Sequence, residues 1–179
     1  MQVHIGKSLL SLLQGDITEQ RVDAIVNAAN EQLAGGSGVD GAIHRVGGPG
    51  IMQDTAARHP DGCPTGEAVV SVAGHLPAEH VIHTVGPVWH GGREGEPAAL
   101  ASCYRRSLQL AVKLDCKSVA FPAISTGVYG YPLDLAANVA LKSVIDFLKW
   151  HKQPGEVRFV LFGEGAWGAF ARSLEIQLD

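Results

Sequence analysis

The sequence lacks the features that several common classes of protein require. Its three cysteines are odd in number and form no C-x-x-C pair, which implies no disulfide framework and suits a reducing compartment. The apolar run LLSLLQ is too short to span a membrane, and it has neither the charged start nor the cleavage pattern of a secretory signal. We therefore expect a cytoplasmic protein with no membrane partner.

Clustered positive charge and metal-ligand spacing are absent as well. The 14 Lys and Arg residues are outnumbered by 18 Asp and Glu residues and form no cluster, so no surface for duplex nucleic acid is evident. The eight histidines show no H-E-x-x-H or similar spacing, and we expect no metal and no cofactor. An anionic ligand would therefore have to be held by local backbone geometry.

What is present is a series of short apolar segments, several of them followed by helical patterns. The segments are LLSLLQ, AIVNAA, AVVSVA, HVIHTV, SVAFPAI and VRFVLF. Apolar residues recur at helical spacing from Leu100 to Ala111, including Tyr104 as an expected core residue, and again after Pro132. A chain of 179 residues is too short for two independent domains. We predict a single domain, 1–179, with the α/β fold of a three-layer α/β/α sandwich around a central mixed, largely parallel sheet. The early strands should pair antiparallel, and ligands should bind beyond the carboxyl ends of the strands.

The glycine-rich stretch GGSGVDGAIH, residues 35–44, fits the dinucleotide fingerprint G-x-G-x-x-G at 36–41. That fingerprint follows a strand directly and has an acidic residue about 20 positions later at the end of the next strand. Here NEQLA intervenes after the strand AIVNAA, and Asp61 lies in the turn-like PDGCPTG, so a Rossmann oxidoreductase is disfavoured. No G-K-[ST] follows, which disfavours a Walker loop. The stretch, and a second one at 124–132, can be anion cradles or ordinary strand-to-helix turns.

Six motifs occur in order along the chain: GDIT, VNAAN, GGSGVDGAIH, CPTGEA, VIHTVGPVW and STGVYGYP. Together they resemble the macrodomain family, specifically its MacroD-type ADP-ribosyl hydrolase branch. The resemblance runs from Gly15 to Pro132 and continues more weakly to FVLFGE. It implies that the two glycine-containing loops embrace the diphosphate and the distal ribose of ADP-ribose.

The resemblance also implies residue roles. From its local sequence alone, Asp16 could be a helix-capping carboxylate. The resemblance implies instead that it accepts a hydrogen bond from the adenine amino group, with Ile17 beside it. Phe162 could be a core residue, but the resemblance implies that it lies against adenine. Asn27 and Asn30, otherwise turn residues, would reach the distal ribose, and Tyr129 would lie against that ribose. The remaining substrate contacts are expected from Gly36, Ser37, Gly38, Val39, Ser125, Thr126, Gly127 and Val128.

Two residues are the catalytic candidates in this interpretation. Asp40 would orient or deprotonate the attacking water, although its carboxylate could equally serve the dipole of a helix that starts there. Asn30 can both donate and accept, and so can fix ribose hydroxyls and a water. His44, one helical turn beyond Asp40, is expected to be packed and hydrogen-bonded. Ser37 departs from the usual run of glycines and should stiffen the loop or add a donor.

The function implied is an ADP-ribose-binding hydrolase that removes mono-ADP-ribose from Asp and Glu side chains and deacetylates O-acetyl-ADP-ribose. The expected partners are ADP-ribose, ADP-ribosylated proteins and O-acetyl-ADP-ribose, and ADP-ribosylated nucleic-acid ends stay open as substrates. The alternative is a non-catalytic reader of ADP-ribose. Asp40 together with Asn30 favours the enzyme, because a reader needs neither near the distal ribose.

Overall fold

A computed structural model describes residues 1–179. The strands are β1 (Gln2–Ile5), β2 (Ser8–Gln14), β3 (Ala24–Ala28), β4 (Ala68–Val72), β5 (His80–Thr84), β6 (Ser118–Phe121) and β7 (Glu156–Leu161). The helices are the short 3-10 helix η1 (Ile17–Glu19), α1 (Gly38–Gly47), α2 (Gly50–Arg58), α3 (Glu96–Lys113), α4 (Leu133–His151) and α5 (Glu164–Leu178). The six short apolar segments of the sequence form the strands β2 to β7, and the two predicted long helices are α3 and α4.

The strands form one seven-stranded sheet in the order β1-β2-β7-β6-β3-β5-β4. The central pairs β2/β7, β7/β6, β6/β3 and β3/β5 are parallel, whereas the outer pairs β1/β2 and β4/β5 are antiparallel. The predicted mixed, largely parallel sheet is therefore confirmed, and its first two strands do pair antiparallel.

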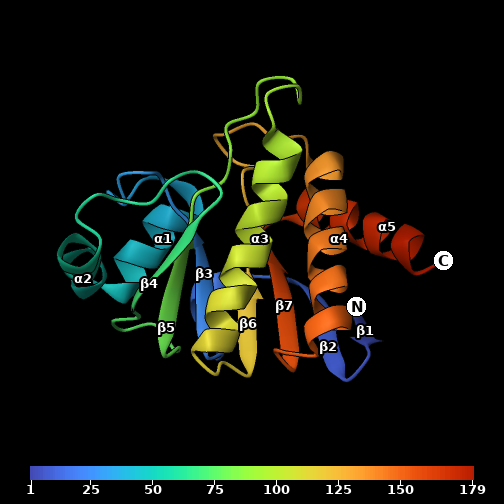
Figure 1. The fold of residues 1–179 in the computed structure, drawn as a ribbon, viewed down its shortest axis with the longest axis horizontal. Coiled ribbons are helices and arrows are strands. Elements are labelled where there is room, and N and C mark those ends of the chain that lie inside the picture. The colour runs from blue at the N-terminus through green and yellow to red at the C-terminus, as the bar shows by residue number, and fades with distance from the viewer.

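The central strands are largely apolar because each of their faces packs into a different core. On β3, Val26 belongs to the core beneath α3, α4 and α5, and its neighbour Ile25 belongs to the core beneath α1 and α2. β7 repeats this alternation, with Phe159 and Leu161 in the first core and Val160 in the second. Figure 1 shows α3 and α4 side by side in front of the sheet, with α1 and α2 gathered beside β4.

Tyr104 lies in the first core, as predicted, with 1% of its surface exposed. Its hydroxyl donates to the carbonyl of Pro122 and accepts from the backbone N–H of Ile124. Burial raises its pKa, so the hydroxyl stays neutral. Tyr104 thus fixes the start of the loop that follows β6, and that loop forms part of the site below.

Candidate functional site

A cleft of about 880 Å³ opens at the carboxyl ends of the parallel strands. Its walls come from the segments that follow β2, β3, β6 and β7 and from the first turns of α1, α4 and α5. This is where ligands bind in sheets of this kind. All predicted contact residues line it except Asn27: Asp16, Ile17, Asn30, Gly36, Ser37, Gly38, Val39, Asp40, Ser125, Thr126, Gly127, Val128, Tyr129 and Phe162.

The cleft lining presents partial positive charges from helix N-termini but only one fully charged basic side chain. Arg45 is the only Lys or Arg side chain in the cleft, while Asp16 and Asp40 are negative. The first turns of α1, α4 and α5 all contribute lining residues, so three helix N-termini meet at one space. Unpaired backbone N–H groups and the helix dipole give each such terminus roughly half a positive charge. The cleft therefore suits a diphosphate held by backbone groups.

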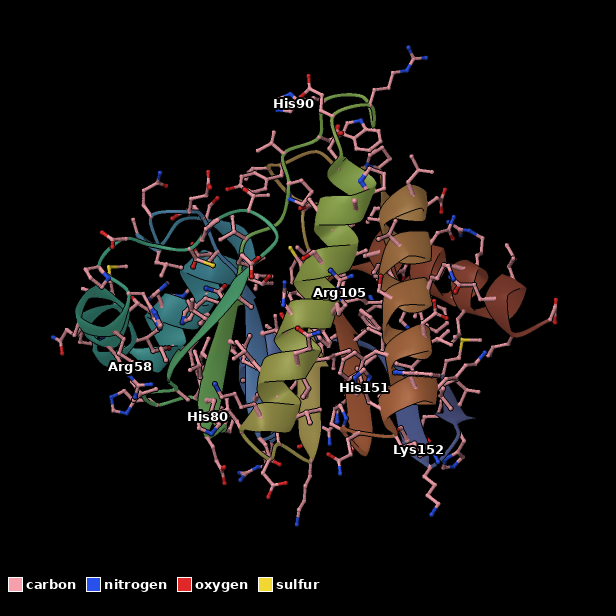
Figure 2. The ribbon with its side chains drawn as sticks, in the orientation of Figure 1. Arg58, His80, His90, Arg105, His151 and Lys152 are labelled. Carbon is pink, nitrogen blue, oxygen red and sulfur yellow. The ribbon has the colours of Figure 1, made fainter.

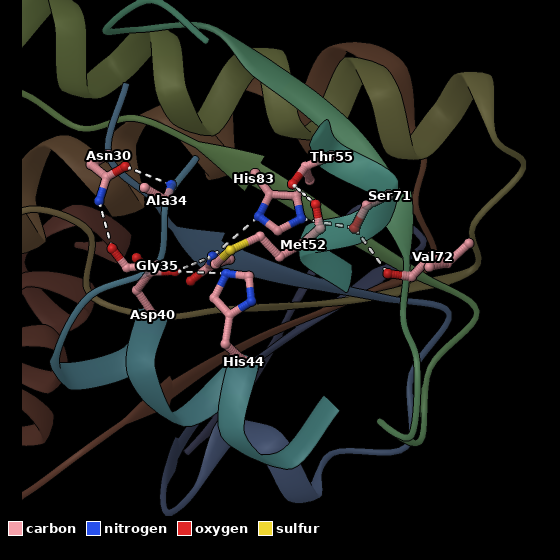
Figure 3. Close-up of polar contacts among 11 residues, drawn as sticks. Asn30, Ala34, Gly35, Asp40, His44, Met52, Thr55, Ser71, Val72 and His83 are labelled. Atoms are coloured by element: carbon pink, nitrogen blue, oxygen red, sulfur yellow. Dashed lines mark hydrogen bonds and ion pairs between the residues drawn. The ribbon is translucent and has the colours of Figure 1, made fainter. Parts of the chain in front are cut away.

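The first glycine loop is held in a compact shape by its glycines and by Asn30. A Cβ added at Gly41 would lie 2.5 Å from the carbonyl oxygen of Gly36, so only glycine allows the loop to fold back onto α1. The Asn30 amide donates to the carbonyl of Gly35 at 2.8 Å and accepts from the N–H of Ala34 at 3.0 Å (Figure 3). One amide hydrogen and one lone pair of Asn30 stay free for a ligand.

Ser37, the departure from the glycine pattern, fits the loop without strain. Its φ of −104° is extended, and its exposed side chain makes no capping hydrogen bond to α1. The hydroxyl is thus an additional donor at the mouth of the cleft, which is one of the two effects expected from the sequence.

The second loop, which contains the stretch 124–132, is strained and buried at Ser125. Ser125 has a left-handed φ of 68°, which non-glycine residues adopt rarely. Its buried hydroxyl has no hydrogen-bond partner within the protein. A Cβ on Gly86 would lie 2.1 Å from this hydroxyl oxygen, so the strand end after β5 must carry glycine there. An unpaired buried hydroxyl that lines a cleft is available to a ligand.

A third loop, between β5 and α3, contacts the second loop. The N–H of Trp89 donates to the carbonyl of Tyr129 at 2.9 Å, and the Trp89 ring packs on Tyr131 with centroids 4.6 Å apart. This loop is held by the carboxylate of Glu96, which accepts from the N–H groups of His90, Gly92 and Glu94. Burial would raise the pKa of Glu96, but these hydrogen bonds outweigh burial and lower the pKa from 4.5 to about 2.

Another part of the cleft lining combines a carboxylate with apolar surface. Asp16 caps η1, because its Oδ1 accepts from the backbone N–H and the hydroxyl of Thr18 at 2.9 and 2.7 Å. Its other oxygen has no partner within the protein and is free to accept from a ligand. Phe162 is 88% exposed beside Val160 and Ile17, so it is not a core residue and presents its ring to the cleft.

Asp40 is buried in the cleft wall near the first glycine loop, with 6% of its surface exposed. Its Oδ1 accepts from the amide nitrogen of Asn27 at 2.9 Å and lies 3.3 Å from Nε2 of His44. Its Oδ2 lies on the side of Gly36, since a Cβ there would be 3.2 Å away. The carboxylate is therefore fixed on one oxygen and faces the glycine loop with the other.

The predicted contact of Asn27 with the distal ribose is corrected by the structure. Asn27 is fully buried on β3 and does not line the cleft. Its amide nitrogen bonds Asp40 and lies 3.1 Å from Nδ1 of His83. Two asparagines three positions apart diverge here, because Asn27 still belongs to the strand whereas Asn30 follows its end. Asn27 thus holds the cleft wall from behind.

Sequence reasoning missed Arg45, His83 and Glu96. Arg45 lies on the cleft side of α1, two turns after Gly38, and helical spacing from the glycine loop could have indicated it. His83 is a polar residue within the apolar segment HVIHTV, and a buried polar residue in such a strand needs a partner. Glu96 carried no comparable signal, because its partners are backbone groups of an irregular loop.

The structure shows neither a metal-binding cluster nor a membrane-spanning helix. The basic side chains labelled in Figure 2 come from several elements, among them Arg58 on α2, Arg105 on α3 and His151 on α4. No three His, Cys, Asp or Glu side chains converge in an arrangement that could hold a metal ion. No helix combines the length and the apolar character that a membrane crossing requires.

Comparison with known proteins gives a consistent result. The family model described as Macro domain matches residues 26–140. The chain is 50% identical over 175 residues to the O-acetyl-ADP-ribose deacetylase of Escherichia coli K12, covering 97% of this chain and 99% of that protein. The macrodomain of Oceanobacillus iheyensis with ADP superposes with a TM-score of 0.94 at 39% identity, covering 99% of this chain and 96% of that one. The Trypanosoma brucei macrodomain in complex with ADP-ribose gives a TM-score of 0.86 at 42% identity, over 92% of this chain and 68% of that one.

Proposed function

Because the chain belongs to the Macro domain family, we propose that it binds ADP-ribose and hydrolyses esters of ADP-ribose. The substrates are O-acetyl-ADP-ribose and mono-ADP-ribose linked to Asp or Glu side chains of proteins. The observation that carries this proposal is the position of Asp40, a carboxylate fixed in the wall of an anion-binding cleft beside the glycine loop.

The ligand lies along the cleft with adenine between Ile17 and Phe162 and with the amino group of adenine on the free oxygen of Asp16. The two glycine-containing loops hold the diphosphate through backbone N–H groups. The distal ribose then reaches the end of the cleft formed by Asn30, Asp40 and Tyr129. Both reactive bonds, the acetyl ester and the acidic side-chain ester, are attached to this ribose.

Hydrolysis of either ester needs one water and no other reactant. The water oxygen forms a bond to the acyl carbon, the ester C–O bond breaks, and the products are a carboxylic acid and ADP-ribose. Asp40 accepts a hydrogen bond from the water, orients it and stabilises the positive charge that develops on it. The diphosphate assists as a second acceptor, and Asn30 holds the ribose hydroxyls.

The decisive experiment offers the purified protein three substrates side by side and measures released ADP-ribose. These are O-acetyl-ADP-ribose, a protein ADP-ribosylated on acidic side chains, and the same protein ADP-ribosylated on serine. Turnover of the two esters is expected. Absence of turnover on every substrate, with binding of ADP-ribose retained, would show that the protein is a reader.

Binding of free ADP-ribose should exceed that of AMP and of NAD by at least about tenfold, or 1.4 kcal/mol. AMP lacks the second phosphate and the distal ribose, and NAD carries nicotinamide where a free ribose is expected. Isothermal titration calorimetry with the three ligands measures the difference. Equal affinity for AMP would show that the distal half of the cleft contributes nothing to binding.

Replacement Asp16→Ala should weaken binding of ADP-ribose by about 1.5 to 3 kcal/mol, the range for a hydrogen bond to a charged acceptor. Asp16→Asn is the matched control, because its amide oxygen can still cap η1 while its NH₂ group cannot accept from the adenine amino group. Both variants should bind more weakly in calorimetry. A loss in the Ala variant alone would assign the effect to the cap.

A further inference from the structure

A chain of buried polar groups leads from Asp40 into the sheet. His83, with 1% of its surface exposed, is the register partner of Asn27 on the neighbouring strand. Nδ1 of His83 lies 3.1 Å from the amide nitrogen of Asn27, and its Nε2 lies 2.8 Å from Oγ of Ser71. Ser71 in turn donates to the carbonyl of Val72 at 2.9 Å (Figure 3). None of these groups is assigned a part in the proposed hydrolysis.

The carbonyl of Val72, at the end of this series of hydrogen bonds that is farthest from Asp40, determines the direction of each of them. The carbonyl of Val72 can only accept, so it takes the single hydroxyl hydrogen of Ser71. Oγ of Ser71 must then accept from Nε2 of His83, which therefore carries the ring hydrogen. A neutral imidazole has one N–H, so Nδ1 of His83 accepts from Asn27. The two hydrogens of the Asn27 amide thus serve His83 and Asp40.

His83 is neutral because burial lowers its pKa from 6.5 to about 3. The positive forms of His44 on α1 and His59 beyond α2 oppose its protonation further, and Asp54 on α2 only partly offsets them. The ring of His44 is stacked on that of His83 with centroids 6.3 Å apart. Over the ordinary pH range the ring therefore keeps one donor and one acceptor.

We propose that His83 is a positioning residue for Asp40, acting through the amide of Asn27. With Nδ1 as an acceptor, Asn27 must point its NH₂ group toward both His83 and Asp40. The flipped amide would place an oxygen against Nδ1 of His83 and against the carboxylate, and both contacts would repel. The amide oxygen of Asn27 is left buried without a partner, which shows that the nitrogen side sets the orientation.

The consequence is that a backbone carbonyl on β4 determines what Asp40 meets on its buried side. Asp40 receives an N–H on Oδ1, and this leaves Oδ2 for the cleft. Without the acceptor on His83, the Asn27 amide would be free to rotate, and Oδ1 of Asp40 would be left with the contact to Nε2 of His44 at 3.3 Å. This role rests on the proposed function of Asp40 in hydrolysis.

A matched pair of variants tests the role. His83→Asn keeps an acceptor close to the place of Nδ1, and His83→Leu has a similar branched shape without one. His83 does not line the cleft, so both variants should bind ADP-ribose within about threefold of the parent. The kcat for ester hydrolysis should fall about 10- to 100-fold in the Leu variant, the scale of a small misplacement of a reacting group. The Asn variant should keep kcat within about threefold of the parent.

The outcomes separate the role of His83 from the proposed function. Equal kcat in the two variants, with an active parent, would overturn the positioning role alone. A parent with no turnover on any ester would overturn the proposed function and this role together. Thermal unfolding shows whether both variants fold.

A second measurement needs no variant and no substrate. Nitrogen-15 NMR of the parent protein should show the His83 ring protonated on Nε2 and unprotonated on Nδ1 from about pH 5 to 8, because its pKa is lowered to about 3. A ring with the hydrogen on Nδ1 would reverse the direction of the hydrogen bonds that His83 makes with Asn27 and Ser71, and this would overturn the inference. If the Leu variant fails to fold, this spectrum decides by itself.

Discussion

An Asp40→Ala variant should lose hydrolysis by about 10²- to 10⁴-fold, the usual contribution of a positioned acid or base. Its affinity for free ADP-ribose should stay within about tenfold of the parent, or 1.4 kcal/mol. The two effects separate because Asp40 lies at the ribose end of the proposed binding mode, while Asp16, Phe162 and the two loops hold the adenine and the diphosphate. Steady-state release of ADP-ribose and calorimetric titration measure them independently.

The stability of this variant has to be measured beside its activity. Removing the carboxylate leaves the amide of Asn27 without its acceptor in a buried place, at a cost of about 1 to 3 kcal/mol. The first turn of α1 also loses an acidic residue that favours the helix dipole. Activity is therefore compared at temperatures where both proteins are folded. A folded Asp40→Ala protein with the turnover of the parent would reduce Asp40 to a helix-start residue.

A Gly127→Glu variant should lose ADP-ribose binding by at least about 100-fold, or 2.7 kcal/mol, while keeping its fold. Gly127 is exposed in the second loop and lines the cleft. A Cβ at this position would meet no atom within 4 Å, and the backbone there is not left-handed. The added carboxylate would face the diphosphate in a cleft whose lining contains no Lys or Arg other than Arg45. Like charges placed in this way cost several kcal/mol.

Gly127→Gln is the matched control for this prediction, because it has the same shape without the charge. It should retain binding within about tenfold of the parent, and both variants should unfold close to the temperature of the parent. Equal losses in the Gln and Glu variants would attribute the effect to bulk. A collapse of thermal stability in both would show that the loop is structural.

The strands were predictable because the central strands are buried on two faces and are therefore mostly apolar, with few polar residues among them. The elements that sequence analysis did not resolve have weak local signals. β1 is a four-residue edge strand, QVHI, too short to show a period. α5 contains Gly165 and Gly168, poor helix formers, and is held by burial of Phe170 and Leu174 instead.

The walls of the cleft were predictable to the extent that their residues form contiguous motifs. The residues behind the wall were not, because their contacts depend on sheet order. β3 lies between β5 and β6, with β4 outside β5, so Asn27 on β3 meets His83 and Ser71 from the two consecutive strands β5 and β4, which come much later in the sequence. Nothing in VNAAN distinguishes the asparagine that faces the cleft from the one buried behind Asp40. Only the position at which β3 ends separates them.

The parallel pairing of β2 with β7 also determines when a newly made chain acquires its cleft. Leu9–Gln14 lie against Glu156–Leu161 in this pair. A ribosome releases the amino-terminal segment first, at about 5 to 20 residues per second, so β2 waits on the order of 10 s for its neighbour. A nascent chain that already carries both glycine-containing loops still lacks Val160 and Phe162, which line the cleft together with Ile17. Its ligand can therefore assist folding only after β7 has been synthesised.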